Sequence, residues 1–354
     1  MTRPDPTELR RFVGSPRQLG RADLFELLDG PGRGSRVARL TAANGFDVEV
    51  LPDRGMDLGM VSWRGVPLAW SSPTGLISAE RLGASEDAWD RGFGGGLVTT
   101  CGLDQFGRPA RSEAGAYLPM HGRAHTLAAS DVRTWADPLG DQGSIGFSGT
   151  TRQVTALGEC LRLDRVITLS SDGATLTLRD RVTNEAPEAW PQLILYHVNL
   201  GWPLLDADAS LDLHVAAEAG ERRLRPPIPR DEAAAAGADT WARMPAPQDA
   251  YPEQVFRHPI DGPATVTARL VSPNTGLAFS LRFESAQLPV LYQWKQAAAG
   301  RYALGIEPAN AIALDGQAEA RANGTLPVLA PGESREYVLT FELTQLASEP
   351  GAGS

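Results

Sequence analysis

Three side chains in this sequence have the types and settings that proton-transfer chemistry needs: His121, His197 and Glu307. His121 lies in a loop-like segment, directly before Gly122. Glu307 ends a strand-like run with apolar neighbours. Burial there would raise the pKa of its carboxyl group toward neutrality, which suits a general base. Taken alone, Glu307 has a simpler alternative, a surface glutamate ahead of the turn at Pro308.

The second histidine lies in an apolar segment, residues 194–200, whose pattern is that of a strand. Ile194, Tyr196 and Val198 would then face the core, and the opposite face would present His197 together with Asn199. A buried His–Asn pair must be hydrogen-bonded or face a cleft. A histidine that is satisfied within the core stays open as the alternative at this point.

Alternation of apolar and polar residues predicts the elements that position these side chains. Asn44-Gly45 predicts a hairpin between residues 36–41 and 46–50. Further strands are predicted at residues 56–63, 66–70, 146–154, 160–169, 174–183, 192–200, 209–216, 264–272, 277–284, 290–296, 301–308 and 334–343. So many strands with almost no convincing helix predict an all-β fold, a large antiparallel β-sandwich of two stacked sheets.

The same pattern predicts the domain organisation. Residues 1–30 are expected to form an irregular N-terminal lead-in with one short helix around residues 21–28, and residues 31–345 a single sandwich domain. Residues 218–254 interrupt the rhythm of strands and predict a long loop excursion, of a kind that often covers a site. Residues 346–354 are expected to be a disordered tail.

Composition narrows the function classes. The formal net charge of −10 argues against a nucleic acid partner, for which a basic surface is expected. No apolar run is long enough to span a bilayer and no signal peptide is recognisable, so we expect no membrane partner and a cytoplasmic location. The two cysteines, Cys101 and Cys160, provide no disulfide framework and fit a reducing compartment.

Metal and phosphate sites are disfavoured. His121 and His125 are four residues apart and, with His197, would be a candidate three-histidine site. The segment contains Gly122 and lacks the glutamate of an HExxH motif, so no metal is expected. The glycines of residues 92–96 precede no Gly-Lys-Ser/Thr, which argues against a phosphate loop and favours a tight turn or a close approach to a ligand.

Together, the three proton-transfer residues resemble the catalytic set of the aldose-1-epimerase (galactose mutarotase-like) family. His121-Gly122 matches the family's His-Gly loop, His197 closely precedes an Asn-Leu pair on a strand, and Glu307 has the place of a late-strand glutamate. The resemblance covers about residues 36–343. The family's Asn-Arg-Ile segment and its sugar-binding aspartate have no clear match, so the chain looks like a divergent branch.

The resemblance implies an isomerase on a galactose mutarotase-like supersandwich, which interconverts the anomers of a free sugar by opening and closing its ring. Glu307 would be the base that takes the proton of the anomeric hydroxyl, and His197 the acid at the ring oxygen. His121 would stabilise charge on that oxygen. Such a reaction needs no metal or nucleotide cofactor, and the expected partner is a small-molecule sugar.

Sugar recognition needs polar groups for the hydroxyls and a flat apolar surface for the C–H face. Candidates are Arg54, Asp104, Gln105, Asn199, Lys295, Trp294 and Asn310, with Phe106 and Trp202 as further aromatic candidates. Lys295 is the only lysine among 33 basic residues, and with Arg54 it would also suit a sugar phosphate or acid. The simpler alternatives are a tight turn at Arg54 and core positions for Trp202 and Trp294.

Two other function classes stay open. An isomerase or lyase that acts on a modified sugar would use the same fold, because a fold does not determine a function. A non-catalytic sugar-binding protein would need no acid/base pair, so the presence of both histidines and the glutamate argues against it. The sequence does not give the oligomeric state, for which a homodimer is one alternative.

Overall fold

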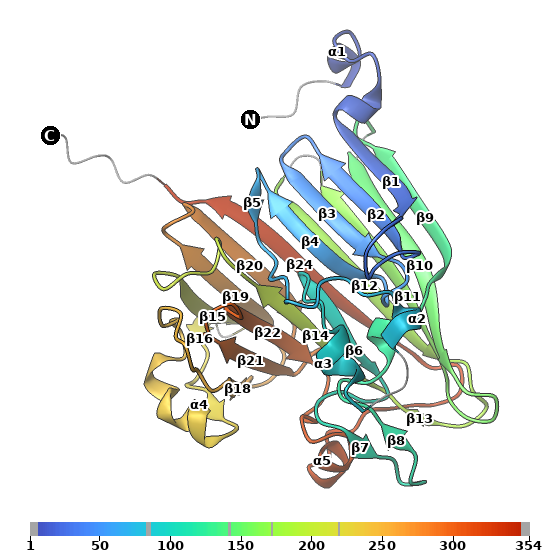
Figure 1. The fold of residues 1–354 in the computed structure, drawn as a ribbon, viewed down its shortest axis with the longest axis vertical. Helices are drawn as coiled ribbons and strands as arrows, with labels where there is room; N and C mark the ends of the chain where they lie inside the picture. Colours follow the sequence, from blue (N-terminus) through green and yellow to red (C-terminus); the bar gives the residue numbers. More distant parts are fainter. Residues whose placement is uncertain (1–5, 83–85, 141–142, 171–172, 219, 348–354) are drawn as a thin grey trace, which may run out of the picture.

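The computed structural model describes residues 6–82, 86–140, 143–170, 173–218 and 220–347. Within these residues the chain forms two large antiparallel sheets that pack face to face (Figure 1). The predicted fold class, a galactose mutarotase-like β-sandwich, is confirmed. The predicted hairpin at Asn44-Gly45 is present, with β2 (Arg36–Ala42) and β3 (Phe46–Leu51) paired on either side of it.

The larger sheet has the strand order β1-β2-β3-β4-β6-β14-β22-β21-β18-β17, with β5 beside β4. Its strands are β1 (Gly20–Glu26), β2 (Arg36–Ala42), β3 (Phe46–Leu51), β4 (Asp57–Trp63), β5 (Val66–Pro67), β6 (Val98–Leu103), β14 (Leu193–Leu200), β17 (Ile228–Pro229), β18 (Gln254–His258), β21 (Val290–Gln296) and β22 (Ala303–Ala309). Strands distant in the sequence, such as β6, β14 and β22, are neighbours at its centre. This centre positions the candidate site.

The smaller sheet has the order β16-β15-β19-β20-β24-β12-β11-β10-β9. Its strands are β9 (Ser130–Asp137), β10 (Ser144–Val154), β11 (Cys160–Ser170), β12 (Thr175–Asn184), β15 (Ser210–Ala217), β16 (Gly220–Arg223), β19 (Thr265–Ser272), β20 (Leu277–Glu284) and β24 (Ser334–Gln345). Buried and accessible residues alternate along β11 and β12, as expected for strands with one covered face.

Short elements connect and cover the two sheets. They are the helices α1 (Pro6–Leu9), α2 (Ala79–Leu82), α3 (Ala88–Gly92), α4 (Glu232–Ala236) and α5 (Gln317–Ala322), the 3-10 helices η1 (Pro16–Gln18), η2 (Ala124–Thr126) and η3 (Ala238–Thr240), and the strand pairs β7 (Ala110–Arg111) with β8 (Tyr117–Leu118) and β13 (Trp190–Pro191) with β23 (Val328–Leu329). None of the helices in the described residues is long and apolar enough to cross a bilayer.

The main apolar core lies between the sheets, and a second apolar cluster lies on the outer face of the larger sheet. The second cluster contains Trp89, Cys101, Phe106, Leu193, Leu195, Val290, Tyr292, Ala309, Ala311, Ala313 and Ala320. Because loops cover this outer face, β14 is buried on both of its faces. Polar side chains that β14 directs outward therefore enter a desolvated region instead of bulk water.

Two parts of the predicted organisation need correction. The predicted helix at residues 21–28 is wrong, because β1 extends the larger sheet by pairing along its full length with β2. The excursion is not a simple loop: β16 extends one sheet, β17 extends the other, and α4 lies between β17 and β18. Residues 348–354 of the predicted tail lie outside the described residues.

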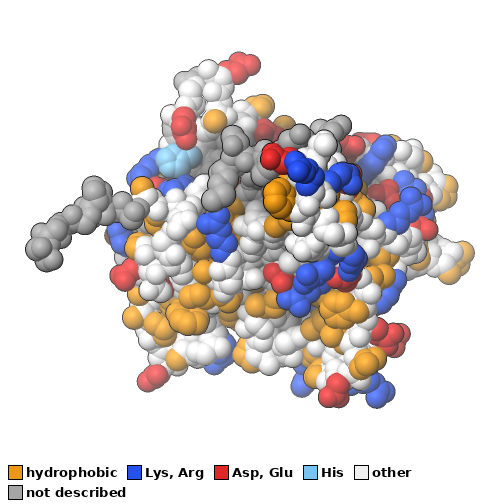
Figure 2. All heavy atoms as spheres, turned by 90° about the horizontal axis from the view of Figure 1, so that it is seen from above, with side chains coloured by type: hydrophobic (Ala, Val, Ile, Leu, Met, Phe, Trp, Pro, Cys, Tyr) orange, Lys and Arg blue, Asp and Glu red, His pale blue; other side chains and the backbone are white. Residues whose placement is uncertain are grey.

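Charges of both signs are interspersed on the face shown in Figure 2. Elsewhere on the surface many arginines pair with carboxylates across strands, as Arg39 does with Asp47 and Arg282 with Glu342. Mixed charges of this kind keep the local field weak and aid solubility.

Candidate active site

The two faces of β14 explain why a histidine can lie inside an apolar strand. Ile194, Tyr196 and Val198 belong to the core between the sheets, whereas Leu195 belongs to the outer apolar cluster. This confirms the predicted division of the strand. His197 lies on the outer face and lines a cleft there.

The neighbouring strand β22 brings Glu307 to His197. Val198 pairs with Ile306, so the next pair along the two antiparallel strands places His197 beside Glu307 on the outer face. Nε2 of His197 lies 3.2 Å from Oε1 of Glu307. Both residues are almost fully buried, with 5% and 3% of their surface exposed. An acid/base pair separated by 110 residues in the sequence is thus assembled by strand register.

His121 reaches the same cleft from a loop that folds back on β6. His121 and Gly122 both have left-handed backbones, with φ of 57° and 74°. A Cβ atom on Gly122 would lie 2.3 Å from the carbonyl oxygens of Gly102 and Gln105, so a side chain would clash with backbone. The amide of Gly102 donates to the carbonyl of His121 and holds the loop in place. The His-Gly pair therefore follows from close packing as well as from chemistry.

Aromatic rings surround the imidazoles. The ring centroid of Trp89, on α3, lies 4.3 Å from that of His121. Those of Phe93 and Trp294 lie 5.2 Å and 5.6 Å from that of His197. With Trp70, these rings line a cleft of about 580 Å³. Such a volume, with aromatic walls and a few polar groups, suits a small-molecule ligand.

Burial shifts the protonation of the central pair in opposite directions. It raises the pKa of Glu307 to about 8, and the negative charge of Glu253 adds to this effect. It lowers the pKa of His197 to about 4, partly offset by the amide of Asn199. Near neutral pH, in the absence of a ligand, the pair therefore holds one proton, mainly on Glu307.

His121 is also held in its neutral form. Burial lowers its pKa well below the ordinary value, and the neighbouring His197 and His125 act in the same direction. A neutral imidazole can either donate or accept one hydrogen bond at each nitrogen, according to its tautomer. This suits a contact with a sugar oxygen whose charge changes during reaction.

Several buried atoms of the site have no hydrogen-bond partner among the described residues. They are Nδ1 of His121, Nδ1 of His197 and Oε1 of Glu307. Leaving a buried polar group unsatisfied costs about 1–3 kcal/mol. The three residues line the same cleft, and unsatisfied buried polar groups are typical of functional sites.

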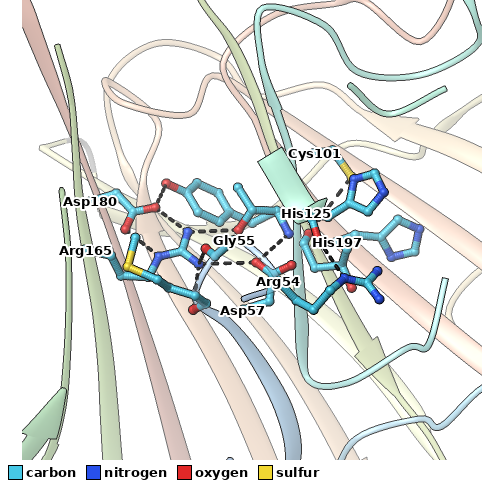
Figure 3. Close-up of polar contacts among 12 residues, drawn as sticks. Arg54, Gly55, Asp57, Cys101, His125, Arg165, Asp180 and His197 are labelled. Carbon is cyan, nitrogen blue, oxygen red and sulfur yellow. Dashed lines mark hydrogen bonds and ion pairs between the residues drawn. The ribbon is translucent and has the colours of Figure 1, made fainter. Parts of the chain in front are cut away.

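The structure separates the predicted sugar-contacting residues into two groups. Of the predicted sugar-contacting residues, only Trp294 is among the described residues that line the cleft. Arg54 is buried elsewhere, and its Nε atom donates to the backbone carbonyl of His125 (Figure 3). Its Nη1 and Nη2 atoms donate to the carbonyls of Ile77 and Gly92. Its role is to join three loop segments, which corrects the interpretation of Arg54 as a sugar or anion ligand.

Lys295 and Asn310 also hold backbone in place. Nζ of Lys295 donates to the carbonyls of Thr240 and Arg243, so the single lysine of the chain fastens the excursion to β21. The side chain of Asn310 accepts from the amide of Ile194 and donates to Gln192. Both side chains point away from the cleft residues, contrary to expectation.

The remaining polar candidates are buried next to the site without lining it. Asn199 donates to the carbonyls of Gly96 and His197. Gln105 donates to the carbonyl of Arg108, and Asp104 accepts from Gln153. The further aromatic candidates also lie outside the cleft lining: Phe106 is part of the outer apolar cluster, and Trp202 is 71% exposed.

Other cleft residues had not been predicted. They include Trp70, Trp89, Phe93, Arg108, Arg230, Asp231, Glu253 and Arg301. Arg230, Asp231 and Glu253 belong to the excursion, which thus contributes one wall of the cleft. The unusual length of that segment was the available signal. The short helix with Trp89 gave none, because a five-residue helix leaves no periodic pattern.

A fully satisfied ionic cluster lies behind the site, between the sheets (Figure 3). The Nε and Nη2 atoms of Arg165 donate to both carboxylate oxygens of Asp180, at 2.7 and 2.6 Å. The hydroxyl of Tyr196 donates to Asp180, and Nη2 of Arg165 also donates to the hydroxyl of Thr100. Tyr196 and His197 are consecutive on β14, so this cluster fixes the strand that carries the candidate acid.

The three histidines of the region pack around one indole ring. Their ring centroids lie 4.3 Å (His121), 5.0 Å (His125) and 6.5 Å (His197) from that of Trp89. Within the described residues, no group of three or more His, Cys, Asp or Glu side chains is placed to hold a metal ion.

The chain has a galactose mutarotase-like β-sandwich fold. A family model described as "Domain of unknown function (DUF4432)" matches residues 32–343, and the chain belongs to that family. No curated protein matches the chain.

Solved structures share the fold at low sequence identity. A putative aldose 1-epimerase from Klebsiella pneumoniae is 24% identical, with a TM-score of 0.81, over 92% of this chain and 83% of that one. A galactose mutarotase-like protein from Clostridium acetobutylicum is 13% identical, with a TM-score of 0.64, over 93% and 100% of the two chains. Galactose 1-epimerase from Lactobacillus acidophilus is 12% identical, with a TM-score of 0.56, over 93% and 100%. The TM-scores show a shared fold, and the sequence identities are low.

Proposed function

We propose that the protein is an isomerase that interconverts the anomers of a free sugar by acid/base opening and closing of the sugar ring. The observation that carries the proposal is the contact between His197 and Glu307, buried at the floor of a cleft with aromatic walls. Because they lie 3.2 Å apart, one bound sugar can contact an acid and a base at the same time. The names of the structural neighbours agree with this class of reaction.

In the proposed reaction, Glu307 takes the proton of the anomeric hydroxyl. The electron pair of that O–H bond forms the carbonyl at C1, the bond from C1 to the ring oxygen breaks, and the ring oxygen takes a proton from His197. Rotation about the bond between C1 and C2 presents the other face of the carbonyl. Closure reverses the proton transfers, so both residues return to their starting state.

The opposite pKa shifts of the pair fit this cycle. Between about pH 4 and pH 8 the two groups share one proton, so the form with a protonated His197 and an ionised Glu307 is a tautomer of the resting form. A sugar that hydrogen-bonds to both groups would stabilise that tautomer. His121 would donate to the ring oxygen, and Trp89, Phe93 and Trp294 would contact the C–H face.

The test is anomer exchange measured by saturation-transfer NMR. The panel contains D-galactose, D-glucose, D-xylose, D-glucuronate and D-glucose 6-phosphate, each with and without the protein. We expect faster exchange for at least one sugar, lost in Glu307→Gln and in His197→Ala. Glu336→Gln is the matched control, since Glu336 is an exposed carboxylate on β24, outside the cleft.

Each other outcome selects a different function. Binding of a sugar to the cleft without any acceleration would contradict the mutarotase proposal and leave a binding protein or another reaction on a modified sugar. Acceleration that survives in both Glu307→Gln and His197→Ala would place the chemistry elsewhere. The identity of the accelerated sugar decides between neutral and acidic substrates.

A further inference from the structure

A second cavity, of about 680 Å³, lies beside the candidate active site and is lined by different residues. Its walls are the β7–β8 hairpin, the turn from β10 to β11, β13 and α5. These elements gather in the lower part of Figure 1. No step of the proposed mechanism uses this cavity. Its volume is in the range of small-molecule sites.

Two aromatic side chains give the cavity a surface for a C–H face. Trp190, on β13, is half-buried and lies against the turn at Gly158. Tyr117, on β8, is half-buried too, and its hydroxyl oxygen is buried without a hydrogen-bond partner among the described residues. Large rings with an unsatisfied polar tip are typical of recognition surfaces.

Asp104 supplies a buried acceptor. Only 3% of the residue is exposed, and its Oδ1 atom accepts from Nε2 of Gln153 at 2.7 Å. Asp104 is one of the residues that line the cavity. Burial raises the pKa of Asp104, while the bond from Gln153 and the charge of Arg123 lower it.

Arg123, which lines the same cavity, supplies hydrogen-bond donors. Its Nη2 atom donates to the carbonyl of Tyr117, which leaves other N–H groups for a ligand. Among the described residues, Arg123 makes no ion pair with Asp104. The two groups thus offer a donor and an acceptor held apart, an arrangement that a hydroxylated ligand can bridge.

The charges of the cavity point to a neutral ligand. The arginines at its rim are already engaged: Arg152 pairs with Glu185, and Arg321 pairs with Glu113. Three arginines and three carboxylates line the cavity, and so their formal charges cancel. An anionic ligand would meet the charge of Asp104, whereas hydroxyl groups would satisfy both Asp104 and Arg123.

A layer of residues joined by side chain–backbone hydrogen bonds lies between the cavity and the cleft. Gln317 donates through Nε2 to the carbonyl of Asp104 and through its amide to Oε1 of Gln105. Gln105 in turn donates to the carbonyl of Arg108, a cleft residue. The two hollows therefore lie on opposite sides of one ordered layer.

We propose that this cavity is a second binding site for a neutral saccharide, in which Trp190 stacks on the C–H face and Asp104 and Arg123 bind hydroxyl groups. This inference stands independently of the proposed catalytic function, because it uses none of the cleft residues. The sequence predicted Asp104 as a sugar ligand of the candidate active site, and this proposal makes it a sugar ligand of the second cavity instead.

The test uses ¹⁹F NMR of protein labelled with 5-fluorotryptophan, which reports Trp190 separately from the cleft tryptophans. Trp→Phe substitutions assign the signals of Trp70, Trp89, Trp190 and Trp294. D-Galactose, D-glucose, lactose and maltose are titrated from about 1 mM to about 100 mM, the range of weak saccharide binding. The full chain is used, as the wild type and as His197→Ala.

We expect the Trp190 signal to shift saturably with at least one saccharide, with the same dependence in His197→Ala. Asp104→Asn keeps the shape of the side chain, and removing its charge should weaken this binding about tenfold or more. Sodium phosphate is titrated as the anion control, and Asp47→Asn, at an exposed ion pair, as the variant control.

Three outcomes would overturn the proposal. They are a Trp190 signal that no saccharide shifts while the fluorine spectrum shows a folded protein, a shift that disappears in His197→Ala, and a shift by phosphate alone. Unchanged affinity in Asp104→Asn, with dispersed signals, would contradict the assigned role of the carboxylate.

Discussion

Two buried polar groups lie on opposite faces of β14, one residue apart, and they differ in how far they are satisfied. Tyr196 points between the sheets to the Asp180–Arg165 pair, where both carboxylate oxygens and the guanidinium have partners. His197 points outward to Glu307, and both of these side chains keep a polar atom without a partner among the described residues. Burial is similar in the two regions, so burial alone does not distinguish structure from function.

The two regions differ in whether neighbouring charges offset the free-energy cost of burying a charged group. In the Arg165 cluster the charges compensate one another: burial acts to lower the pKa of Arg165, and Asp180 more than reverses this effect. In the cleft nothing compensates Glu307, so its pKa rises to about 8. Unsatisfied groups of this kind are typical of sites that await a ligand.

The largest expected effect is a loss of catalytic rate on substitution in the cleft, which the ionic cluster should not share. Glu307→Gln should reduce the rate of anomer exchange by about 10²–10⁴-fold, the usual contribution of a general base. Its unfolding free energy at neutral pH should not fall, because the amide replaces a carboxyl group that burial already keeps protonated. Exchange NMR and urea unfolding measure the two quantities. Loss of stability in step with activity would mean that Glu307 is structural.

The converse change concerns the ionic cluster. Asp180→Asn removes the nearer of the two countercharges of buried Arg165 and leaves Asp57, 3.3 Å from Nη1, which should cost about 3–5 kcal/mol of unfolding free energy. Urea unfolding measures this, with Asp47→Asn at the exposed Arg39 pair as the matched control, expected to cost no more than about 1 kcal/mol. Equal effects of the two substitutions would contradict a special role for the buried cluster.

The third prediction concerns stability as a function of pH. Glu307 binds its proton more tightly in the folded state, with a pKa of about 8 against an ordinary value of 4.5, so stability should fall as pH rises between these values. His197 binds its proton less tightly when folded, so its own contribution to stability rises from about pH 4 to pH 6.5 and offsets that of Glu307 there, which leaves the net decline between about pH 6.5 and pH 8. Tm measured from pH 4 to pH 9 tests this, and Glu307→Gln should remove the decline on the alkaline side.

The smallest expected effect comes from Glu253, which accepts from the indole N–H of Trp294 at the rim of the cleft. Its negative charge helps to raise the pKa of Glu307. The profile of kcat/KM against pH should be bell-shaped, with limbs that belong to the His197–Glu307 pair near pH 4 and pH 8. Glu253→Gln should move the upper limb to lower pH and change the rate at its maximum by roughly threefold or less. An unmoved limb would show that Glu253 acts only through Trp294.

The fold could be predicted from the sequence because strands and turns have patterns in neighbouring residues. The alternation of β14 and the turn at Asn44-Gly45 predicted strands that are present. Residues 21–28 were mistaken for a helix because Leu, Glu, Ala and Arg favour helices, and the partner that makes β1 a strand lies in β2. In the site, the three residues predicted to transfer protons line one cleft, and their catalytic role stays a prediction. Most of the predicted sugar ligands lie elsewhere.

The sequence by itself determined the two-sheet architecture and the chemical identity of the central residues. The reason is that the alternation of apolar and polar residues in a strand, like residue type, can be read from neighbouring positions. Tertiary structure decided which polar side chains are satisfied. Hydrogen bonds to distant backbone carbonyls and amides satisfy the side chains of Arg54, Lys295 and Asn310. By contrast, His197 and Glu307 each keep a polar atom without a partner among the described residues. The physical reason is that satisfaction depends on atoms from distant segments, which only the packing of the whole chain brings within hydrogen-bond reach.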